Sequence, residues 1–234
     1  MVKERLLRLH RHQEIKLRKI MKVFNLIKVV LVSAGLALVS HYSFAQTPVN
    51  QLEELMQGFS NYSADFEQYT KDDKGRKGEV SKGSMSVQRP NKFRWQTQTP
   101  FPQLIVSDGD YIWIYDQDLE QATRKKVNPS ETNGAALILN GNVKALSSKF
   151  QIMQIIDTKR EKLFELVPKK ESNFEKIQLF FADKVMQELM LTDIFGKQTT
   201  IILTKAKLNE KFKTNLFKFS PPKGTDVMTD GAES

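Results

Sequence analysis

The fold is decided at one stretch of the sequence, Arg89-Pro90-Asn91-Lys92-Phe93-Arg94-Trp95, where two predicted β-strands meet. Before it, Met85 and Val87 alternate with polar residues, and within it aromatic residues alternate with basic ones, which is typical of half-buried strands. Arg89 continues the spacing of Met85 and Val87, so its guanidinium is predicted to stand at the end of an apolar strand face. The alternative is an ordinary tight turn in which Arg89 reaches water along its aliphatic stem.

Strand patterns continue on both sides of this stretch. Most predicted strands are joined by short, turn-like links, so neighbouring strands should pair antiparallel. Residues 226–234 are expected to be a polar tail. The predicted strands are 63–70, 78–88, 93–98, 104–106, 111–115, 120–127, 152–158, 163–167, 177–181, 188–192, 199–204 and 217–220.

Helix signals frame these strands. Thr47 and Pro48 have the residue types of a helix N-cap and first helical position, and an apolar stripe with helical spacing follows over 52–59. A second short helix is predicted over 142–150, and residues 135–139 are apolar without strand alternation. These helices are expected to cover one face of a sheet.

The positive charge of the sequence is concentrated at its N-terminal end. The chain has 234 residues and a formal net charge of +9, from 36 Lys and Arg against 27 Asp and Glu. Residues 1–45 hold nine of these bases and two of the acids, which leaves 27 bases and 25 acids in residues 46–234. Such a nearly neutral chain does not favour a nucleic-acid-binding protein.

The sequence after residue 45 contains neither histidine nor cysteine, because the histidines are His10, His12 and His41 and cysteine is absent. Histidine-dependent triads, cysteine nucleophiles and ordinary zinc sites are therefore excluded there. We predict no catalytic residue, no metal and no cofactor, and we expect that the protein is not an enzyme.

Carboxylate chemistry is the one kind of catalysis left open. Asp108 and Asp110 flank Gly109, and a carboxylate pair could indicate a hydrolase or a calcium site. Aspartate and glycine are also turn formers, and no further ligands complete a metal loop. We therefore assign these residues to a turn and keep a periplasmic carboxylate-dependent hydrolase as an alternative.

Residues 21–45 have the three-part pattern of a secretory signal peptide. Two lysines precede the uncharged, mostly apolar run 29–39, and Ser43-Phe44-Ala45 places small residues at the cleavage positions. The run is shorter than the ~20 residues that span a bilayer. We expect export to the periplasm of a Gram-negative bacterium and cleavage after this alanine, with a retained anchor as the alternative. Residues 1–20 are expected to be a spurious or basic extension before the true start at Met21.

Several stretches together resemble the periplasmic outer-membrane lipoprotein carriers, the LolA family. The first is the pattern Arg-Pro-Asn-x-Phe-x-Trp at 89–95. The others follow in the same order as in that family and span most of the chain after residue 45. They are Val106–Tyr115, Glu120–Thr123 and Phe217–Gly224.

We therefore expect a mainly β (α+β) fold in a single domain, residues 46–234. It should be a curved, open antiparallel half-barrel sheet with about three short helices covering its concave face. The resemblance implies a monomeric periplasmic chaperone in outer-membrane biogenesis. Such a protein accepts triacylated lipoproteins from an inner-membrane ABC release complex, binds their acyl chains and transfers them to an outer-membrane receptor lipoprotein.

Two alternatives share this architecture. One is the receptor lipoprotein itself, which would need a lipid-bearing cysteine that the sequence lacks. The other is a lipid-sensing regulatory domain of similar fold, which would need further domains or a membrane anchor.

The expected lipid-binding and lid-switch residues are Met85, Val87, Arg89, Phe93, Trp95, Trp113, Leu137 and Leu139. The strand at 111–115 has aromatic residues on one face and isoleucines on the other. The pattern alone leaves open whether this strand is buried on both sides or forms the wall of a ligand site.

Arg89 has a special part in this expectation. A buried guanidinium needs hydrogen-bond acceptors, since leaving it unpaired costs several kcal/mol. The carbonyls that end the short helices after Pro129 are the expected acceptors. The resemblance implies that these bonds close a lid over the cavity, break when acyl chains enter, and are needed for onward transfer.

Overall fold

The computed structural model describes residues 46–127, 138 and 141–230. All of them lie in one compact unit of the chain, Gln46–Ser234. The predicted extension and signal peptide lie outside the described residues, as do Leu137 and Leu139, so these predictions stay untested.

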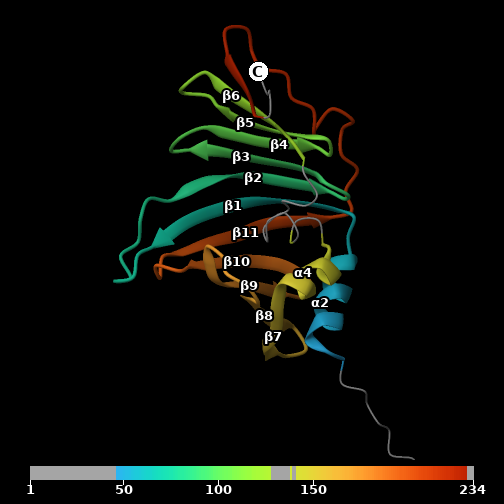
Figure 1. Ribbon diagram of the computed structural model, residues 1–234. Helices are drawn as coiled ribbons and strands as arrows, with labels where there is room; N and C mark the ends of the chain where they lie inside the picture. The colour runs from blue at the N-terminus through green and yellow to red at the C-terminus, as the bar shows by residue number, and fades with distance from the viewer. Residues whose placement is uncertain (1–45, 128–137, 139–140, 231–234) are drawn as a thin grey trace, which may run out of the picture. The chain divides into compact units, whose positions relative to one another are not determined.

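Twelve strands form one open, curved sheet in the order β12-β6-β5-β4-β3-β2-β1-β11-β10-β9-β8-β7 (Figure 1). All neighbouring strands run antiparallel except β12, which lies parallel to β6. The strands are β1 (Asn61–Lys71), β2 (Ser81–Gln88), β3 (Lys92–Thr99), β4 (Gln103–Asp108), β5 (Tyr111–Asp116), β6 (Gln121–Lys126), β7 (Phe150–Asp157), β8 (Glu161–Pro168), β9 (Phe174–Ala182), β10 (Val185–Asp193), β11 (Gln198–Leu208) and β12 (Asp226–Asp230). The predicted mainly β architecture with an open sheet is confirmed.

Two helices, α2 (Pro48–Gln57) and α4 (Val143–Lys149), lie on the concave side of the sheet (Figure 1). Helix α2 begins at the predicted cap, where the Thr47 hydroxyl accepts from the amide of Asn50 at 3.2 Å. Helix α4 begins at Asn142, whose side chain accepts from the amide of Ala145 at 3.0 Å. Of the three expected helices, the one over 135–139 falls almost wholly outside the described residues. Within the described part of the chain, no helix is long and apolar enough to cross a membrane.

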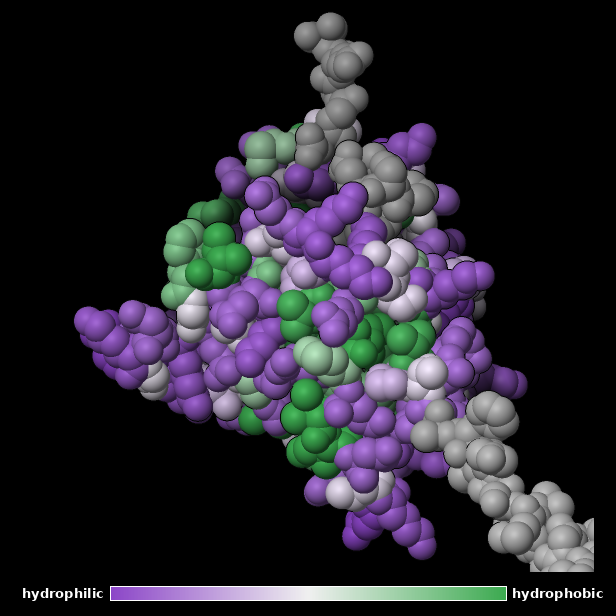
Figure 2. Space-filling view, turned by 60° about the horizontal axis from the view of Figure 1, so that its bottom comes forward, coloured by the Kyte–Doolittle hydropathy of each residue, from purple (hydrophilic) through white to green (hydrophobic). Residues whose placement is uncertain are grey.

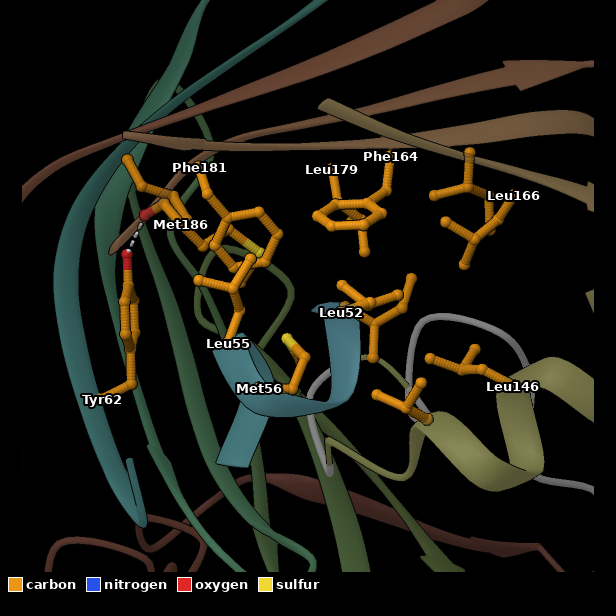
Figure 3. Close-up of a cluster of buried hydrophobic side chains, with 14 of the residues drawn as sticks. Leu52, Leu55, Met56, Tyr62, Leu146, Phe164, Leu166, Leu179, Phe181 and Met186 are labelled. Atoms are coloured by element: carbon orange, nitrogen blue, oxygen red, sulfur yellow. Dashed lines mark hydrogen bonds between the residues drawn. The ribbon is translucent and has the colours of Figure 1, made fainter. Parts of the chain in front are cut away.

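The main core lies between these helices and the half of the sheet that runs from β1 through β11 to β7. The apolar stripe of α2 points toward β8, β9 and β10 (Figure 3), because helical spacing places its large side chains on one face. Tyr62 stands at one end of this core and donates a hydrogen bond from its hydroxyl to the Met186 carbonyl at 2.8 Å. Burial raises the pKa of Tyr62. The largest fully buried side chains here include Leu52, Met56, Tyr62, Leu146, Phe164, Leu166, Leu179 and Phe181.

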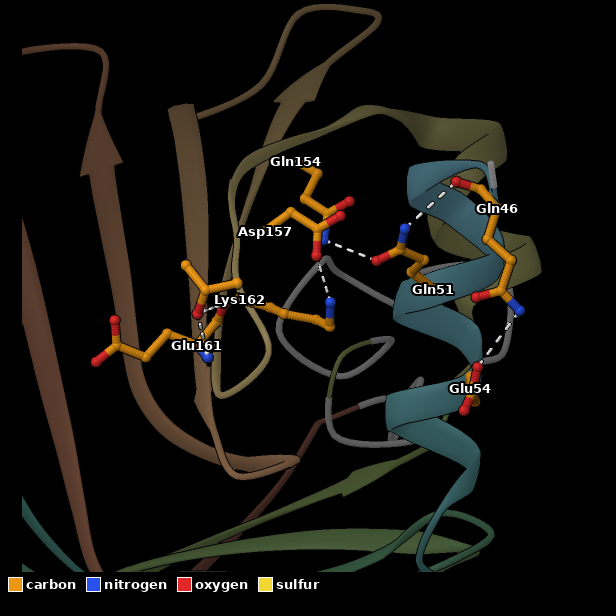
Figure 4. A network of polar contacts seen from close by, with 8 residues as sticks. Gln46, Gln51, Glu54, Gln154, Asp157, Glu161 and Lys162 are labelled. Carbon is orange, nitrogen blue, oxygen red and sulfur yellow. Dashed lines mark hydrogen bonds and ion pairs between the residues drawn. The ribbon is translucent and has the colours of Figure 1, made fainter. Parts of the chain in front are cut away.

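A polar network ties α2 to the hairpin of β7 and β8 (Figure 4). Gln51 accepts a hydrogen bond from the Gln154 side chain at 2.8 Å, and Lys162 pairs with Asp157. The α2 helix is thus held on its hydrophobic face by the core and at its edge by polar contacts.

A second, smaller core lies on the outer face of β4 to β6, separate from the first. Val106, Ala122 and Phe217 are buried there. Phe217 belongs to the segment after β11, for which the sequence predicts a last strand over 217–220. That prediction is wrong, and so is the polar tail after 226: the last strand is β12, which pairs with β6. The prolines at 221–222 end the segment 217–220. The chain continues beyond them, and residues 226–230 pair with the edge of β6.

Candidate functional site

A cavity of about 520 Å³ opens on the concave face of the sheet, between the strands and the main core. Strands β1 to β5 and β9 to β11 supply most of its wall, and none of its described lining residues carries a charge. Such a wall fits an apolar ligand, since it has almost no polar group to orient a polar one. The lining residues are Gln68, Met85, Phe93, Trp95, Ile105, Ile112, Ile138, Phe174, Met186, Leu189, Leu191, Thr199, Ile201 and Leu203.

Hydrophobic residues are also open to solvent on the molecular surface. In Figure 2 they gather near the middle of the face in view, and hydrophilic residues surround them. A contiguous exposed apolar area is typical of binding sites for ligands or partners.

The floor of the cavity is built around Trp95. Its ring stacks on Phe66 at a centroid distance of 4.0 Å. Gly83 lies beneath this pair, where a Cβ atom would stand 2.8 Å from the Phe66 ring and 2.0 Å from the Gln96 carbonyl oxygen. Glycine therefore leaves room for the Phe66 ring, on which the Trp95 ring stacks.

The structure brings together only part of the predicted set. Met85, Phe93 and Trp95 line the cavity, whereas Val87 is buried beside it in the core. Trp113 does not line it. Its ring packs against Phe219 on the outer face, at a centroid distance of 5.5 Å, because strand alternation turns Ile112 to the cavity instead.

Most of the apolar residues on the other strands of the cavity were not predicted from the sequence. They alternate within their strands, so a signal was present, but a lone strand does not reveal which of its faces is concave. The pairing does: Met85 lies opposite Trp95, and Trp95 opposite Ile105, so the three share a face. The missed residues include Ile105, Ile112, Leu189, Leu191, Ile201 and Leu203.

Arg89 ends the same strand face and caps helix α2. Its Nη1 donates to the carbonyl oxygens of Met56 and Phe59, the latter at 2.9 Å. Its Cζ lies 4.1 Å from the centroid of the Phe59 ring. These two described acceptors lie at the end of α2, which the sequence pattern does not predict. The predicted acceptors after Pro129 lie largely outside the described residues, so that prediction stays untested.

The positive guanidinium of Arg89 and the carbonyl end of α2 attract each other. The carbonyl end of α2 carries a partial negative charge and has no basic residue in its own last turn. A partly buried cation at such a position stabilises it by up to about 2 kcal/mol. Burial lowers the pKa of Arg89 to about 10, so the guanidinium still carries its charge at neutral pH.

Asp108 performs the turn function predicted for it. Its Oδ1 accepts hydrogen bonds from the amides of Asp110, at 2.9 Å, and Tyr111, at 2.8 Å. These bonds hold the link between β4 and β5. No described group of three or more His, Cys, Asp or Glu residues is arranged to hold a metal.

One protein family matches the part of the chain that forms the cavity and contains Arg89. Residues 57–220 match the family described as outer membrane lipoprotein carrier protein LolA. That span contains Arg89 and every residue that lines the cavity. The chain belongs to the LolA family. The resemblance of the motifs at 89–95 and 106–115 to that family is therefore confirmed.

Individual members of the LolA family agree with this assignment. The chain is 39% identical over 194 residues to the outer-membrane lipoprotein carrier protein of Legionella pneumophila (strain Lens), a match that covers 82% of this chain and 95% of that one. It is 36% identical over 208 residues to the protein of the same name from Chromobacterium violaceum, covering 88% and 98%. Among solved structures, an uncharacterized conserved protein from Thermus thermophilus aligns with a TM-score of 0.51 and 13% identity, over 80% of this chain and 100% of that chain, and shows likeness of fold alone.

Proposed function

We propose that this protein carries lipoproteins destined for the outer membrane and shelters their acyl chains in the cavity. The observation that supports this most directly is an uncharged, almost wholly apolar cavity of about 520 Å³ in a member of the LolA family. The protein acts in the periplasm as a monomeric chaperone rather than an enzyme.

The physical need for such a carrier follows from the cost of exposing acyl chains to water, which is ~0.8 kcal/mol for each CH₂ group. A chain of many such groups does not leave a membrane at a useful rate unless another apolar surface receives it. The wall formed by Trp95, Ile105 and Leu189 provides that surface. Because it contains no charged group among its described residues, it suits acyl chains rather than polar groups.

Release of the acyl chains requires a closed state of the protein that competes with the loaded state. Arg89 stabilises this closed state. Its bonds to Met56 and Phe59 hold the end of α2 in the cargo-free state. They are worth only a few kcal/mol, since charge-assisted hydrogen bonds contribute about 1.5–3 kcal/mol each and burial of the cation opposes them. Acyl chains can therefore displace this closed arrangement, and its recovery helps to expel them.

The cargo reaches and leaves this cavity through partners on the two membranes. An inner-membrane ABC release complex loads the carrier, and an outer-membrane receptor lipoprotein unloads it. The lipid-binding residues are Met85, Phe93 and Trp95, with Arg89 as the switch, and Leu137 and Leu139 remain candidates beside the cavity-lining Ile138.

The proposed function is tested by the content of the cavity after purification. Protein isolated gently from the periplasm of a Gram-negative host should carry acyl lipid or lipoprotein, seen as added mass by native mass spectrometry. Protein that never carries acyl lipid, and that hydrolyses glycans until Asp108 is replaced by Asn, would favour the hydrolase instead.

The switch is tested by Arg89→Leu, which removes the bonds to α2 while keeping the face apolar. The variant should still accept lipoprotein from inner-membrane vesicles, but its transfer to the receptor should fall tenfold or more, the effect of roughly 1.4 kcal/mol lost from the closed state. Arg94→Leu is the matched control, because Arg94 also contacts a backbone carbonyl, that of Leu216 at 3.4 Å, but on the outer face. Wild-type transfer by Arg89→Leu would leave Arg89 with a structural role alone.

A further inference from the structure

Gly141 lies directly against the guanidinium of Arg89. A Cβ atom at this position would stand 2.4 Å from Cζ, 2.5 Å from Nη2 and 2.7 Å from Nη1 of Arg89. Non-bonded atoms do not approach so closely, so the guanidinium occupies the space that any other side chain at position 141 would take. Its φ of +66° adds a backbone conformation that glycine adopts most easily.

The guanidinium cannot simply move aside. It is held by the carbonyls of Met56 and Phe59 and lies against the Phe59 ring. The clash would therefore fall on a fixed group rather than on the free end of a surface side chain. Relief would require Arg89 to give up its bonds to α2, or the turn at Gly141 to shift away.

The turn at Gly141 connects the cavity to α4. The Gly141 amide donates to the Ile138 carbonyl at 3.0 Å, and the Gly141 carbonyl accepts from the Val143 amide, also at 3.0 Å. Ile138 lines the cavity, and Val143 begins α4. Through this turn, one guanidinium touches both the end of α2 and the start of α4.

We propose that Gly141 is a positioning residue for Arg89: its missing side chain forms the slot in which the guanidinium joins the start of α4 to the end of α2. The closed arrangement then depends on a pair of positions, not on Arg89 alone. A side chain at 141 shifts the protein toward the open, loadable state while leaving the charge of Arg89 intact. The effect of Gly141 on acyl-chain loading rests on the proposed carrier function, whereas its contact with Arg89 does not.

The chain offers a close control for the backbone effect of a substitution. Gly75 has a φ of +77°, similar to that of Gly141, yet a Cβ atom there would meet nothing within 4 Å. Gly75→Ala therefore introduces the same kind of backbone strain without any steric contact. The difference between Gly141→Ala and Gly75→Ala isolates the contact with Arg89.

The test measures hydrogen exchange of the α2 and α4 amides and binding of a fluorescent palmitate analogue, using the chain from Gln46 onward with its natural C-terminus. Gly141→Ala should raise exchange at the ends of both helices, and apparent affinity for the analogue, by about fivefold or more, the lower end of typical coupling between sites. Gly75→Ala should change neither. Equal behaviour of the two variants would overturn the proposal.

A double-mutant cycle with Arg89→Ala keeps the result decisive even if Gly141→Ala folds poorly. With Arg89 shortened, a Cβ atom at 141 has room, so Gly141→Ala should then add no more than Gly75→Ala does, and the double variant should be better folded than Gly141→Ala alone. If Gly141→Ala has the same effect in both backgrounds, Gly141 does not position Arg89. Hydrogen exchange can be measured without cargo. If the two substitutions are coupled in exchange but the protein does not bind the palmitate analogue, the carrier function is contradicted and the contact between Arg89 and Gly141 is still supported.

Discussion

The two tryptophans of the chain lie on opposite faces of the same sheet, and their surroundings differ. Trp95, on the concave face, stacks on Phe66 and borders a cavity. Trp113, on the outer face, is covered by Phe219 from the segment after β11. Both faces are apolar in the sequence, so hydrophobicity alone does not distinguish a ligand site from a core.

The difference lies in what the chain itself provides to cover each face. On the outer face, Phe217 and Phe219 fill the space over β4 to β6, and Arg124 lies 3.6 Å from the Tyr111 ring. On the concave face, α2 and α4 cover only part of the sheet, and volume remains over β2 to β5. The apolar face that the described residues leave partly uncovered is the one available for cargo.

Phenylalanine truncation on the two faces should produce the largest contrast. Phe217→Ala removes a buried ring from the outer core and should lower the free energy of unfolding by about 3–5 kcal/mol. Phe93→Ala, the same change on the cavity wall, should cost only about 1–2 kcal/mol, because that ring already borders open space. Urea denaturation with an unchanged slope measures both. Equal costs would mean that the cavity wall is packed as tightly as a core.

Fluorescence of single-tryptophan variants should sharpen the same comparison without a large change in stability. In Trp113→Phe only Trp95 emits, and palmitate should shift its emission to shorter wavelength, because the acyl chain displaces water from the ring. In Trp95→Phe only Trp113 emits, and palmitate should leave its spectrum unchanged. A response from Trp113 instead would place the ligand on the outer face.

The smallest expected effect concerns the rim of the concave side, where Lys162 pairs with Asp157 beside α2. The hydrogen bond from Lys162, followed by the attraction of its charge, lowers the pKa of Asp157 below its ordinary value. Because this pKa is lower in the folded state, the pair stabilises the fold above the pKa of the unfolded chain. The contribution is lost as the pH falls through the folded value.

Asp157→Asn should therefore slightly lower the melting temperature at pH 7 and leave it unchanged at about pH 2, below the titration of the carboxyl. The Asp157 carboxylate is exposed and Lys162 is half-buried, so about 1 M salt should weaken the difference. The Asp157 carboxyl titration, followed by NMR, should show a lowered pKa in the wild-type protein and a higher one in Lys162→Met. If the melting temperatures of the wild type and Asp157→Asn still differ at about pH 2, the effect does not come from the charge of Asp157.

Strand alternation and helix caps predict much of this fold, since they are local properties: the helix from Pro48 and the hairpin at Arg89 both follow from neighbouring residues. The identity of the concave face is not local, and this is why Trp113 was predicted in the site while Ile105 was not. The contact of Arg89 with the end of α2 was missed for the same reason, because the acceptors Met56 and Phe59 lie 33 and 30 residues upstream. The strand β12 was missed because only pairing with β6 makes that polar segment a strand.

The position of β1 in the middle of the sheet also constrains the order of folding. It pairs on one side with β2, the next strand along the chain, and on the other side with β11. The first hairpin can therefore form early, but Phe66 and its neighbours keep one unpaired edge until residues 198–208 pair with β1. Such long-range pairing is slow, and an unpaired edge invites association with other chains. The β1 strand thus keeps one edge open to association with other chains until β11 has paired with it.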